Sequence, residues 1–440
     1  MNVVFIVVDT LRADHLGCYG YERPTSPNLD TFAETAVVCD RHLATAIPTG
    51  PSFATINTGQ YSIRHGVVSH GGGKEIPRSA PWMPELFLQH GLTTCAVDNL
   101  AGWRAGYDRG YEFYVDPTRK RTLSINADSR ELNRRVVPWL EQHHGEDFYL
   151  FVHYWDPHTP YLPPRAYRTL FYKGDPNDPK HTSLAGMEEH PLGRTWRDTW
   201  FNQLGPNITD ANYIEALYDA EIRYCDESIG KLLKAVERLG HRDDTMVVVT
   251  GDHGELMYRH GVFFDHHGLY DGNLRVPFIV RHPDLNTGRY TFMTEHVDVA
   301  PTMLDLCGAE VPAAMDGVSL APWLKGEKTG PVRPFSVSQE CTWQMKWCLR
   351  TETHKFILAR EEDFYRTPMR ELYDLREDPG EFANIIDREP DLAADLEQKL
   401  EGWIAARMRE CGLTEDPLVT AGLSLGKGWK EQRANPDLAV

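Results

Sequence analysis

Apolar runs that end in charged residues mark the first part of the chain. Residues 1–8 form an apolar, β-branched run that ends at Asp9, and residues 245–250 form another that ends just before Asp252 and His253. Continuous apolar runs of this length are typical of buried parallel strands, which deliver the next residue to the carboxyl edge of the sheet. The pattern therefore predicts two strands whose ends can meet at one site.

A long helical pattern precedes the second of these strands. Apolar residues recur at helical spacing from Asp210 to Gly240, where the glycine ends the pattern. Strand-like runs alternate with helical patterns up to about Leu324, which is the rhythm of a parallel sheet covered on both faces. We therefore expect an α/β fold with a large, mostly parallel sheet between helices.

The pattern changes after residue 330. Four short apolar runs predict antiparallel strands, and a helix is expected to pack on them: 335–337, 347–350, 355–358 and 371–374, followed by the helix 391–408. This predicts a catalytic domain over 1–330, a smaller α+β subdomain with an antiparallel sheet over 331–413, and an irregular tail over 414–440.

One segment of the first domain is too long for a simple connection. Residues 160–206 are rich in Pro, Gly and His and carry Trp196, Trp200 and Phe201 as apolar anchors. Long insertions at an active-site edge usually shape substrate access, so we expect that role here. A contact in a homo-oligomer is the alternative.

Composition narrows the classes of partner. The chain has 440 residues, a formal charge of -18 and no apolar stretch near the roughly 20 residues of a membrane helix. The charge argues against nucleic acid or an anionic membrane as a partner, and any small anionic substrate would have to be captured locally. The scattered cysteines and the lack of a signal-peptide pattern lead us to expect reduced thiols and a cytoplasmic protein.

The segment 49–59, Thr-Gly-Pro-Ser-Phe-Ala-Thr-Ile-Asn-Thr-Gly, is typical of the start of a helix. Pro51 suits a first helical position, and Thr49 or Gly50 can cap ahead of it, so backbone N–H groups would face an anion at position 49. The ordinary alternative is that Thr49 is only an N-cap.

Together these positions predict a metal site. Asp9, Asp252, His253 and the hydroxyl oxygen of Thr49 form a set of oxygen and nitrogen donors that suits one divalent ion. Each strand end alone is weak support, because Asp after a strand is also ordinary turn chemistry.

The motifs as a whole resemble the sulfatase branch of the alkaline phosphatase superfamily, over nearly the whole chain. Residues 49–59 resemble the signature Cys/Ser-x-Pro-Ser-Arg-x-x-x-x-Thr-Gly. Further matching segments follow in the family's order: 16–20, 27–30, 153–161, 270–277, 298–305 and 371–381. The resemblance implies a hydrolase of ester bonds.

The departures from that pattern change the expected chemistry. Formylglycine is made only from cysteine or serine, so none is expected at Thr49, and Phe53 replaces the arginine that helps to hold the nucleophile loop. The pairs Asp9-Thr10 and Asp252-His253 replace the family's Asp-Asp and Asp-Asn. The imidazole moves the expected metal from calcium or magnesium toward zinc or manganese.

The resemblance also implies roles for other residues. His158 takes the place of the family's substrate histidine, and His266 falls at the substrate lysine. His267 could instead hold a second metal with His158, and Asp156 is nearby in sequence, although one metal is favoured. Thr10, Gly50 and Asn99 are expected to contact substrate, whereas His65, His153 and His260 are expected to be structural or supporting. Any single histidine among the 19 is more often structural than catalytic.

The threonine and its His-containing ligand set resemble phosphoryl-transferring relatives, such as nucleotide pyrophosphatase/phosphodiesterases and lipoteichoic acid synthases. The leading hypothesis is therefore a metal-dependent hydrolase of phosphodiesters or phosphonate monoesters that acts through a covalent phospho-Thr49. A sulfuric-ester hydrolase without formylglycine is the first alternative. A binding protein that has lost turnover is the second, supported by Phe53.

Overall fold

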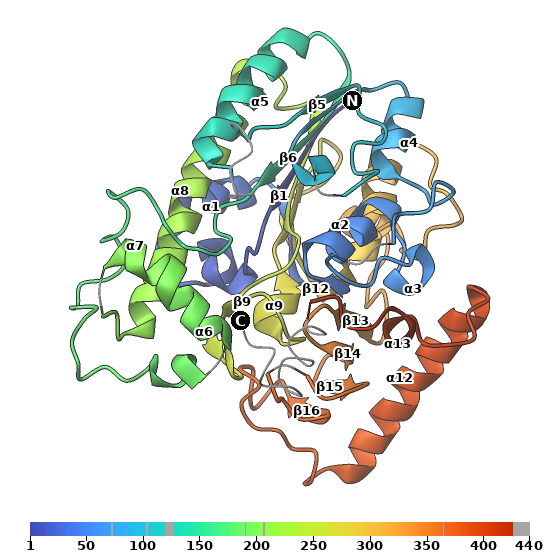
Figure 1. Ribbon diagram of the computed structural model, residues 1–440. Coiled ribbons are helices and arrows are strands. Elements are labelled where there is room, and N and C mark those ends of the chain that lie inside the picture. Colours follow the sequence, from blue (N-terminus) through green and yellow to red (C-terminus); the bar gives the residue numbers. More distant parts are fainter. Residues whose placement is uncertain are drawn as a thin grey trace.

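The computed structural model describes residues 1–71, 74–102, 104–118, 127–189, 191–205, 207–363 and 365–425. Within them, a nine-stranded sheet has the order β10-β2-β11-β7-β1-β6-β4-β5, with β12 paired to β2 (Figure 1). Its strands are β1 (Asn2–Val8), β2 (Val37–Leu43), β4 (Thr93–Val97), β5 (Phe113–Val115), β6 (Phe148–Tyr154), β7 (Thr245–Gly251), β10 (Arg275–Val276), β11 (Phe278–Arg281) and β12 (Gly288–Glu295).

The sheet is parallel at its centre and mixed at one edge. Strands β7, β1, β6, β4 and β5 run parallel, whereas β11 is antiparallel to both β7 and β2. The prediction of an α/β fold with a mostly parallel sheet is confirmed, and β10 and β11 are the strands that run antiparallel to their neighbours. Chain direction is a property of the connections, which the apolar pattern of a buried strand does not encode.

Strand β1 sets the position of the site. All seven of its residues are buried, because β6 and β7 pair with its two sides. Val8 lies level with Tyr154 of β6 and Gly251 of β7. The residues that follow the three strands therefore leave the sheet side by side at its carboxyl edge.

Helices cover both faces of this sheet (Figure 1). One face carries α1 (Pro27–Ala33), α5 (Ser129–His143) and α8 (Ala211–Arg238), and the other carries α2 (Thr49–Thr58), α3 (Ser62–His65), α4 (Met83–Gln89) and α10 (Val299–Leu306). Helix α8 confirms the helix predicted from residue 210, and the side chain of Asp210 caps it by accepting a hydrogen bond from the N–H of Asn212. Short elements are α9 (Asp271–Leu274), α11 (Ala321–Leu324) and the 3-10 turns η1 (Ala13–His15), η2 (Gly17–Tyr19), η3 (Leu100–Gly102) and η6 (His296–Asp298).

The C-terminal strands form a second sheet in the order β16-β15-β14-β13-β3. Its elements are β3 (Ala46–Ile47), β13 (Ser336–Cys341), β14 (Met345–Arg350), β15 (His354–Ala359) and β16 (Arg370–Asp374), with α12 (Pro390–Glu410) packed on β14 and β15. The predicted antiparallel strands and helix are confirmed. However, β3 comes from the first part of the chain and pairs parallel to β13, so that Glu340 lies level with Ile47. The small sheet is thus attached to the segment that leads into Thr49.

Two segments for which no helix or strand was predicted contain short helices. Helix α13 (Pro417–Ala421) lies in the tail expected to be irregular, and Leu418 and Leu423 are buried in the core of the small sheet; residues 426–440 lie outside the described residues. The excursion 160–206 contains η4 (Ala185–Glu189), α6 (Pro191–Thr195), a π-helix (Trp196–Phe201) and α7 (Asn202–Leu204). Trp200 and Phe201 pack on Phe264 of the hairpin β8 (Leu256–Arg259) and β9 (Val262–Asp265). These aromatic contacts attach the excursion to the hairpin beside the site.

The eight cysteines are free thiols, as the sequence predicts. Five of them are buried, so they contribute to packing as small apolar side chains. Across the described residues, the structure has no helix with the length and apolar character needed to cross a membrane.

Candidate active site

Three ligands of the predicted metal set converge at the carboxyl edge of the large sheet. Ligand atoms of Asp9, Asp252 and His253 all lie within 4.8 Å of one another, and all three residues are buried. Asp252 Oδ1 accepts hydrogen bonds from the backbone N–H groups of Thr10 (3.1 Å) and His253 (2.8 Å). The other Asp252 oxygen and both oxygens of Asp9 accept no well-formed hydrogen bond. Buried carboxylate oxygens without donors are costly, so this cluster fits a bound cation.

Thr49 completes this set at the first residue of α2. Its Oγ1 lies 3.2 Å from His253 Nε2, and His253 Nδ1 lies 3.0 Å from the Gly254 carbonyl oxygen. A carbonyl only accepts, so Nδ1 carries the proton and the lone pair of Nε2 faces the Thr49 hydroxyl. The helix begins two residues earlier than Pro51 suggests, and the Thr49 side chain makes no capping bond. The N-cap interpretation of Thr49 is therefore wrong.

The spacing of these donor atoms suits one small divalent ion. His253 Nε2 lies 3.2 Å from Thr49 Oγ1 and 3.3 Å from Asp252 Oδ2. Ligands that bind one ion tetrahedrally at about 2.0–2.2 Å are separated by roughly 3.3–3.6 Å. Asp9, Thr49, Asp252 and His253 could therefore hold a metal with little rearrangement.

A buried histidine with a raised pKa lies beside Asp9. His153 Nδ1 lies 2.8 Å from Asp98 Oδ1, and its Nε2 lies 3.3 Å from Asp9 Oδ2. Burial is the largest influence and lowers the pKa of His153, but the two carboxylates outweigh it and raise the pKa to about 9. The Phe53 ring packs edge-on against this imidazole at 4.7 Å. The chain therefore places a phenylalanine against an imidazolium where the resemblance led us to expect an arginine.

The predicted substrate histidines lie next to the metal ligands. The His266 ring is 5.0 Å from that of His253 and 4.9 Å from that of His158, and His158 Nδ1 donates to the Thr159 carbonyl oxygen at 2.6 Å. His267 lies beside His266, with ring centroids 5.0 Å apart. The two histidines proposed for a second metal, His158 and His267, thus each lie next to His266.

Asp156 does not join these histidines. Its Oδ2 accepts a hydrogen bond from the backbone N–H of Ser129 at 3.0 Å. Burial, followed by repulsion from Asp128, raises the pKa of Asp156 to about 7. Asp156 is close to His158 in sequence, but its side chain faces α5 and not these histidines.

The three predicted substrate contacts have different surroundings. Thr10 is buried in a left-handed conformation (φ 53°), and its backbone joins the strand ends by donating to Asp252 and accepting from the Tyr218 hydroxyl at 2.7 Å. Such a conformation costs a β-branched residue about 1–3 kcal/mol, which indicates that the position is held by its surroundings. Asn99 accepts from the indole N–H of Trp155 at 2.9 Å, and the Gly50 carbonyl accepts from a tyrosine hydroxyl at 2.6 Å.

Arg104 is a site residue that the sequence did not reveal. A Cβ atom placed on Gly50 would lie only 3.0 Å from Arg104 Nε, so the guanidinium packs directly on the first turn of α2. Its Nη2 and Nη1 donate to the carbonyl oxygens of Ser69 (2.7 Å) and Lys74 (3.1 Å). Arg104 follows η3 in an irregular segment with no motif, so only the tertiary structure brings this cation to the nucleophile helix.

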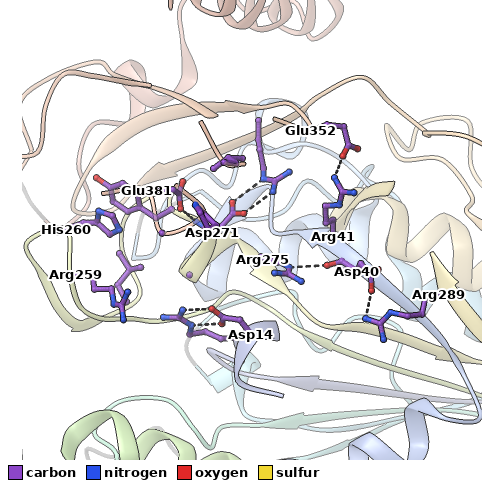
Figure 2. A pocket seen from close by; sticks show the side chains of 18 residues that line it. Asp14, Asp40, Arg41, Arg259, His260, Asp271, Arg275, Arg289, Glu352 and Glu381 are labelled. Atoms are coloured by element: carbon purple, nitrogen blue, oxygen red, sulfur yellow. Dashed lines mark hydrogen bonds and ion pairs between the residues drawn. The ribbon is translucent and has the colours of Figure 1, made fainter. Parts of the chain in front are cut away.

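A separate charged cavity of about 520 Å³ lies at the junction of the two sheets (Figure 2). Oppositely charged side chains of its wall pair with each other: Arg12 with Asp14, Arg41 with Glu352, Arg289 with Asp40, and Arg350 with Asp271. None of the predicted metal ligands or catalytic residues lines it. The ion pairs Arg41–Glu352 and Arg350–Asp271 connect the first domain to the C-terminal subdomain, and the predicted catalytic residues lie outside this cavity.

Comparison with known proteins agrees with the fold. The family model "Sulfatase" matches residues 1–309, and the model "N-sulphoglucosamine sulphohydrolase, C-terminal" matches residues 259–406. The chain is 24% identical to the N-acetylglucosamine-6-O-sulfatase of Bacteroides thetaiotaomicron, with 88% of this chain and 82% of that protein covered.

Solved structures show the same fold. That of BT4656 in complex with its substrate D-glucosamine-2-N,6-O-disulfate has a TM-score of 0.76 at 20% identity and covers 94% of this chain and 99% of that chain. The phosphonate monoester hydrolase of Agrobacterium radiobacter has a TM-score of 0.73 at 20% identity, covering 92% and 96%. Because a family model matches well over half of the residues, this chain belongs to the sulfatase family, within the alkaline phosphatase superfamily.

Proposed function

We propose that this chain hydrolyses a small anionic ester with Thr49 as the nucleophile, and that a sulfate ester is the first substrate class to test. The nucleophile is supported by the position of the Thr49 hydroxyl at the start of α2, 3.2 Å from His253 Nε2. His253 in turn clusters with the buried carboxylates of Asp9 and Asp252. Family membership and the sulfatases among the relatives support the sulfate ester over the phosphodiester that the sequence first suggested.

The chain's own groups can carry both halves of the reaction. Thr49 releases its hydroxyl proton to solvent and its Oγ attacks the sulfur or phosphorus atom. The bond from that atom to the alcohol oxygen breaks, and its electron pair leaves with the alcohol. His158 or His266 is placed to protonate that oxygen, because the His266 ring lies beside that of His253 and the His158 ring lies beside that of His266. Water then attacks the same central atom, and Thr49 Oγ leaves and recovers its proton. The products are an alcohol and the free acid.

Positive groups around Thr49 would bind the anion. The first N–H groups of α2 have no partners within the helix, and the Arg104 guanidinium packs on Gly50 beside them. His153 balances the charge of Asp9 from inside the fold. A local set of this kind can capture an anion on a chain whose formal charge is -18.

The metal that Asp9, Thr49, Asp252 and His253 would hold supplies Lewis acidity, which lowers the pKa of a bound hydroxyl and polarises the ester. Because one of these ligands is an imidazole, zinc or manganese suits the site better than calcium.

Phosphonate monoesters and phosphodiesters form the second candidate class, and Thr49 itself favours them. Threonine cannot give formylglycine and has a single hydroxyl, so the ester formed on it must be cleaved by water at the central atom. Asp252 and His253 also form the ligand pair that resembles phosphoryl-transferring relatives more than sulfatases. The fold is compatible with this chemistry, since it is shared with a phosphonate monoester hydrolase.

The test compares Thr49→Val with the parent chain on an aryl sulfate, an aryl phosphonate monoester and a bis-aryl phosphodiester. Valine keeps the shape but removes the hydroxyl, so we expect kcat/KM to fall by at least about a thousandfold on the preferred ester. Thr58→Val is the matched control, because Thr58 is buried at the other end of α2, where its hydroxyl donates to the Ala54 carbonyl oxygen and accepts from the Gln60 N–H.

Each outcome separates one interpretation from another. Full activity of Thr49→Val would rule out the nucleophile. A parent chain with a strong preference for the phosphonate or the phosphodiester would replace sulfate by the second class. A parent chain that takes up no divalent metal and turns over none of the three esters would favour the non-catalytic binding protein.

A further inference from the structure

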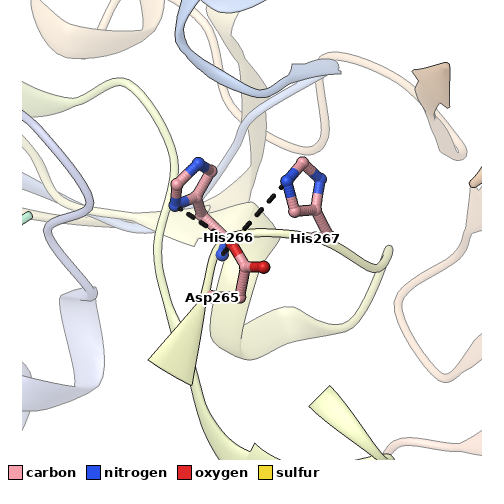
Figure 3. Close-up of side chains that lie close together, drawn as sticks. All are labelled: Asp265, His266 and His267. Carbon is pink, nitrogen blue, oxygen red and sulfur yellow. Dashed lines mark hydrogen bonds and ion pairs between the residues drawn. The ribbon is translucent and has the colours of Figure 1, made fainter. Parts of the chain in front are cut away.

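A second group of metal-type ligands lies at the end of the β8–β9 hairpin. Asp265, His266 and His267 are consecutive, and each offers a ligand atom within 4.8 Å of the others. Figure 3 shows both imidazoles linked to the Asp265 carboxylate. Asp265 Oδ1 is 3.6 Å from His266 Nδ1 and 3.6 Å from His267 Nε2. These separations are too long for good hydrogen bonds and match the roughly 3.3–3.6 Å between ligands of one small ion.

A buried acid without donors faces this group. Glu255 has no exposed surface, neither of its carboxylate oxygens accepts a hydrogen bond, and its Oε1 lies 3.9 Å from His266 Nδ1. The Tyr161 hydroxyl lies close to the Glu255 carboxylate, but the two groups do not form a hydrogen bond. His266 Nδ1 also has no hydrogen-bond partner. Unsatisfied buried groups of this kind are rare unless a cation, or water bound with it, satisfies them.

The surrounding contacts orient the ligands. His267 Nδ1 donates to Glu340 Oε1 at 2.6 Å, which leaves the lone pair of Nε2 directed at Asp265. Imidazoles that bind metals are commonly held by a carboxylate in this way. The other Glu340 oxygen accepts from the backbone N–H of Gly268, and Asp265 Oδ2 accepts from the Tyr365 hydroxyl at 3.0 Å. Neither the acid nor the imidazole needs to move to face an ion.

An anion is the alternative occupant, and the charges argue against it. Glu255, Asp265 and Glu340 surround the two histidines from three elements, namely the strand ends of the hairpin and β13. An anion would be repelled by these carboxylates, whereas a dication is attracted. The mixture of imidazole nitrogen and carboxylate oxygen suits zinc or manganese.

We propose that Asp265, His266 and His267 form a second divalent-metal site, with Glu255 adding negative charge on the side of His266. The site is distinct from Asp9, Asp252 and His253 but lies next to it, since the His253 and His266 rings are 5.0 Å apart. It does not include Asp156, and it stands whichever ester the enzyme hydrolyses.

The experiment measures metal bound per chain, independently of activity. The full chain is stripped with chelator, loaded with excess zinc or manganese, desalted and analysed by mass spectrometry of its metal content. We expect about two ions for the parent chain and about one for His266→Gln, for His267→Gln and for Asp252→Asn. Combining Asp252→Asn with His266→Gln should leave about none.

His266→Gln is the safer variant, because no hydrogen bond to its ring is lost. His260→Asn is the matched control on the same hairpin turn: His260 stacks on Tyr270, outside the group, and asparagine tolerates its left-handed backbone (φ 58°). Glu340→Gln should keep the second ion but weaken its binding about 10- to 100-fold, as loss of a carboxylate behind a ligating histidine does. One ion in the parent chain, unchanged in the folded His266→Gln variant, would overturn the proposal.

Discussion

Buried His65 should make the fold lose stability in mild acid. His65 is at the end of α3 with 1% of its surface exposed, and both ring nitrogens are engaged. Its Nδ1 accepts from the backbone N–H of Val67 at 3.1 Å, so its Nε2 donates to Thr55 Oγ1 at 3.0 Å. These two bonds require the neutral ring. Burial, with a smaller contribution from Arg104, lowers the pKa of His65 to about 3.

The direction and size of the effect follow from proton linkage. In the unfolded chain a histidine has a pKa of about 6.5, so below that pH the unfolded state takes up a proton that folded His65 does not. The contribution of His65 is present above pH 6.5 and is lost as the pH falls toward 3. A pH of 5 is about 1.5 units below the unfolded-state pKa of about 6.5. Protonation of His65 in the unfolded chain therefore lowers the free energy of unfolding by about 2 kcal/mol at pH 5.

The assay compares the pH dependence of two chains. Urea unfolding of the parent and of His65→Gln is followed by tryptophan fluorescence at pH 7.5 and pH 5.0. The variant is expected to be less stable at both, but to lose about 2 kcal/mol less than the parent between them. His90→Gln, at an exposed position after α4, is the control and should keep the parental dependence. Equal pH dependence in the parent and in His65→Gln would show that His65 is not held neutral.

Two further predictions concern residues around Thr49. Phe53→Ala should lower the free energy of unfolding by about 3–5 kcal/mol, because the ring is fully buried between Phe151 and His153. Phe53→Leu should lower it by less in the same denaturant series. An unchanged unfolding midpoint for the alanine variant would contradict a packing role for the Phe53 ring. Arg104→Met should reduce kcat/KM at least about tenfold, or about 1.4 kcal/mol, on the preferred ester, with partial recovery in Arg104→Lys. Lys74→Met is the control for a nearby exposed cation, and an equal loss there would contradict a specific role for Arg104.

The predictions that succeeded concern strands and their ends. Buried parallel strands need continuous apolar runs, and their pairing register follows from that burial. Val8 and Gly251 are level in the sheet, so Asp9 and Asp252 emerge together. The helix over 211–238 was recognisable because its apolar face repeats with the period of a helix.

The features that the sequence did not predict depend on contacts between distant segments. Pro51 suggested where α2 begins, but the preceding segment pairs with the small sheet through β3, and the helix starts at Thr49. Asp156 lies two residues before His158 in sequence, yet its carboxylate turns to the N–H of Ser129. Local pattern carries no information on which of several donors a buried carboxylate will meet.

The amino-acid sequence by itself determined the α/β class, the order of the family motifs and the presence of threonine at position 49, because each depends only on residue type and spacing. Only the tertiary structure decided that His153 lies against Asp9, that Arg104 packs on Gly50, and that Glu340 of the small sheet orients His267. These contacts join residues far apart in the chain, and their geometry results from the packing of the two sheets and their helices.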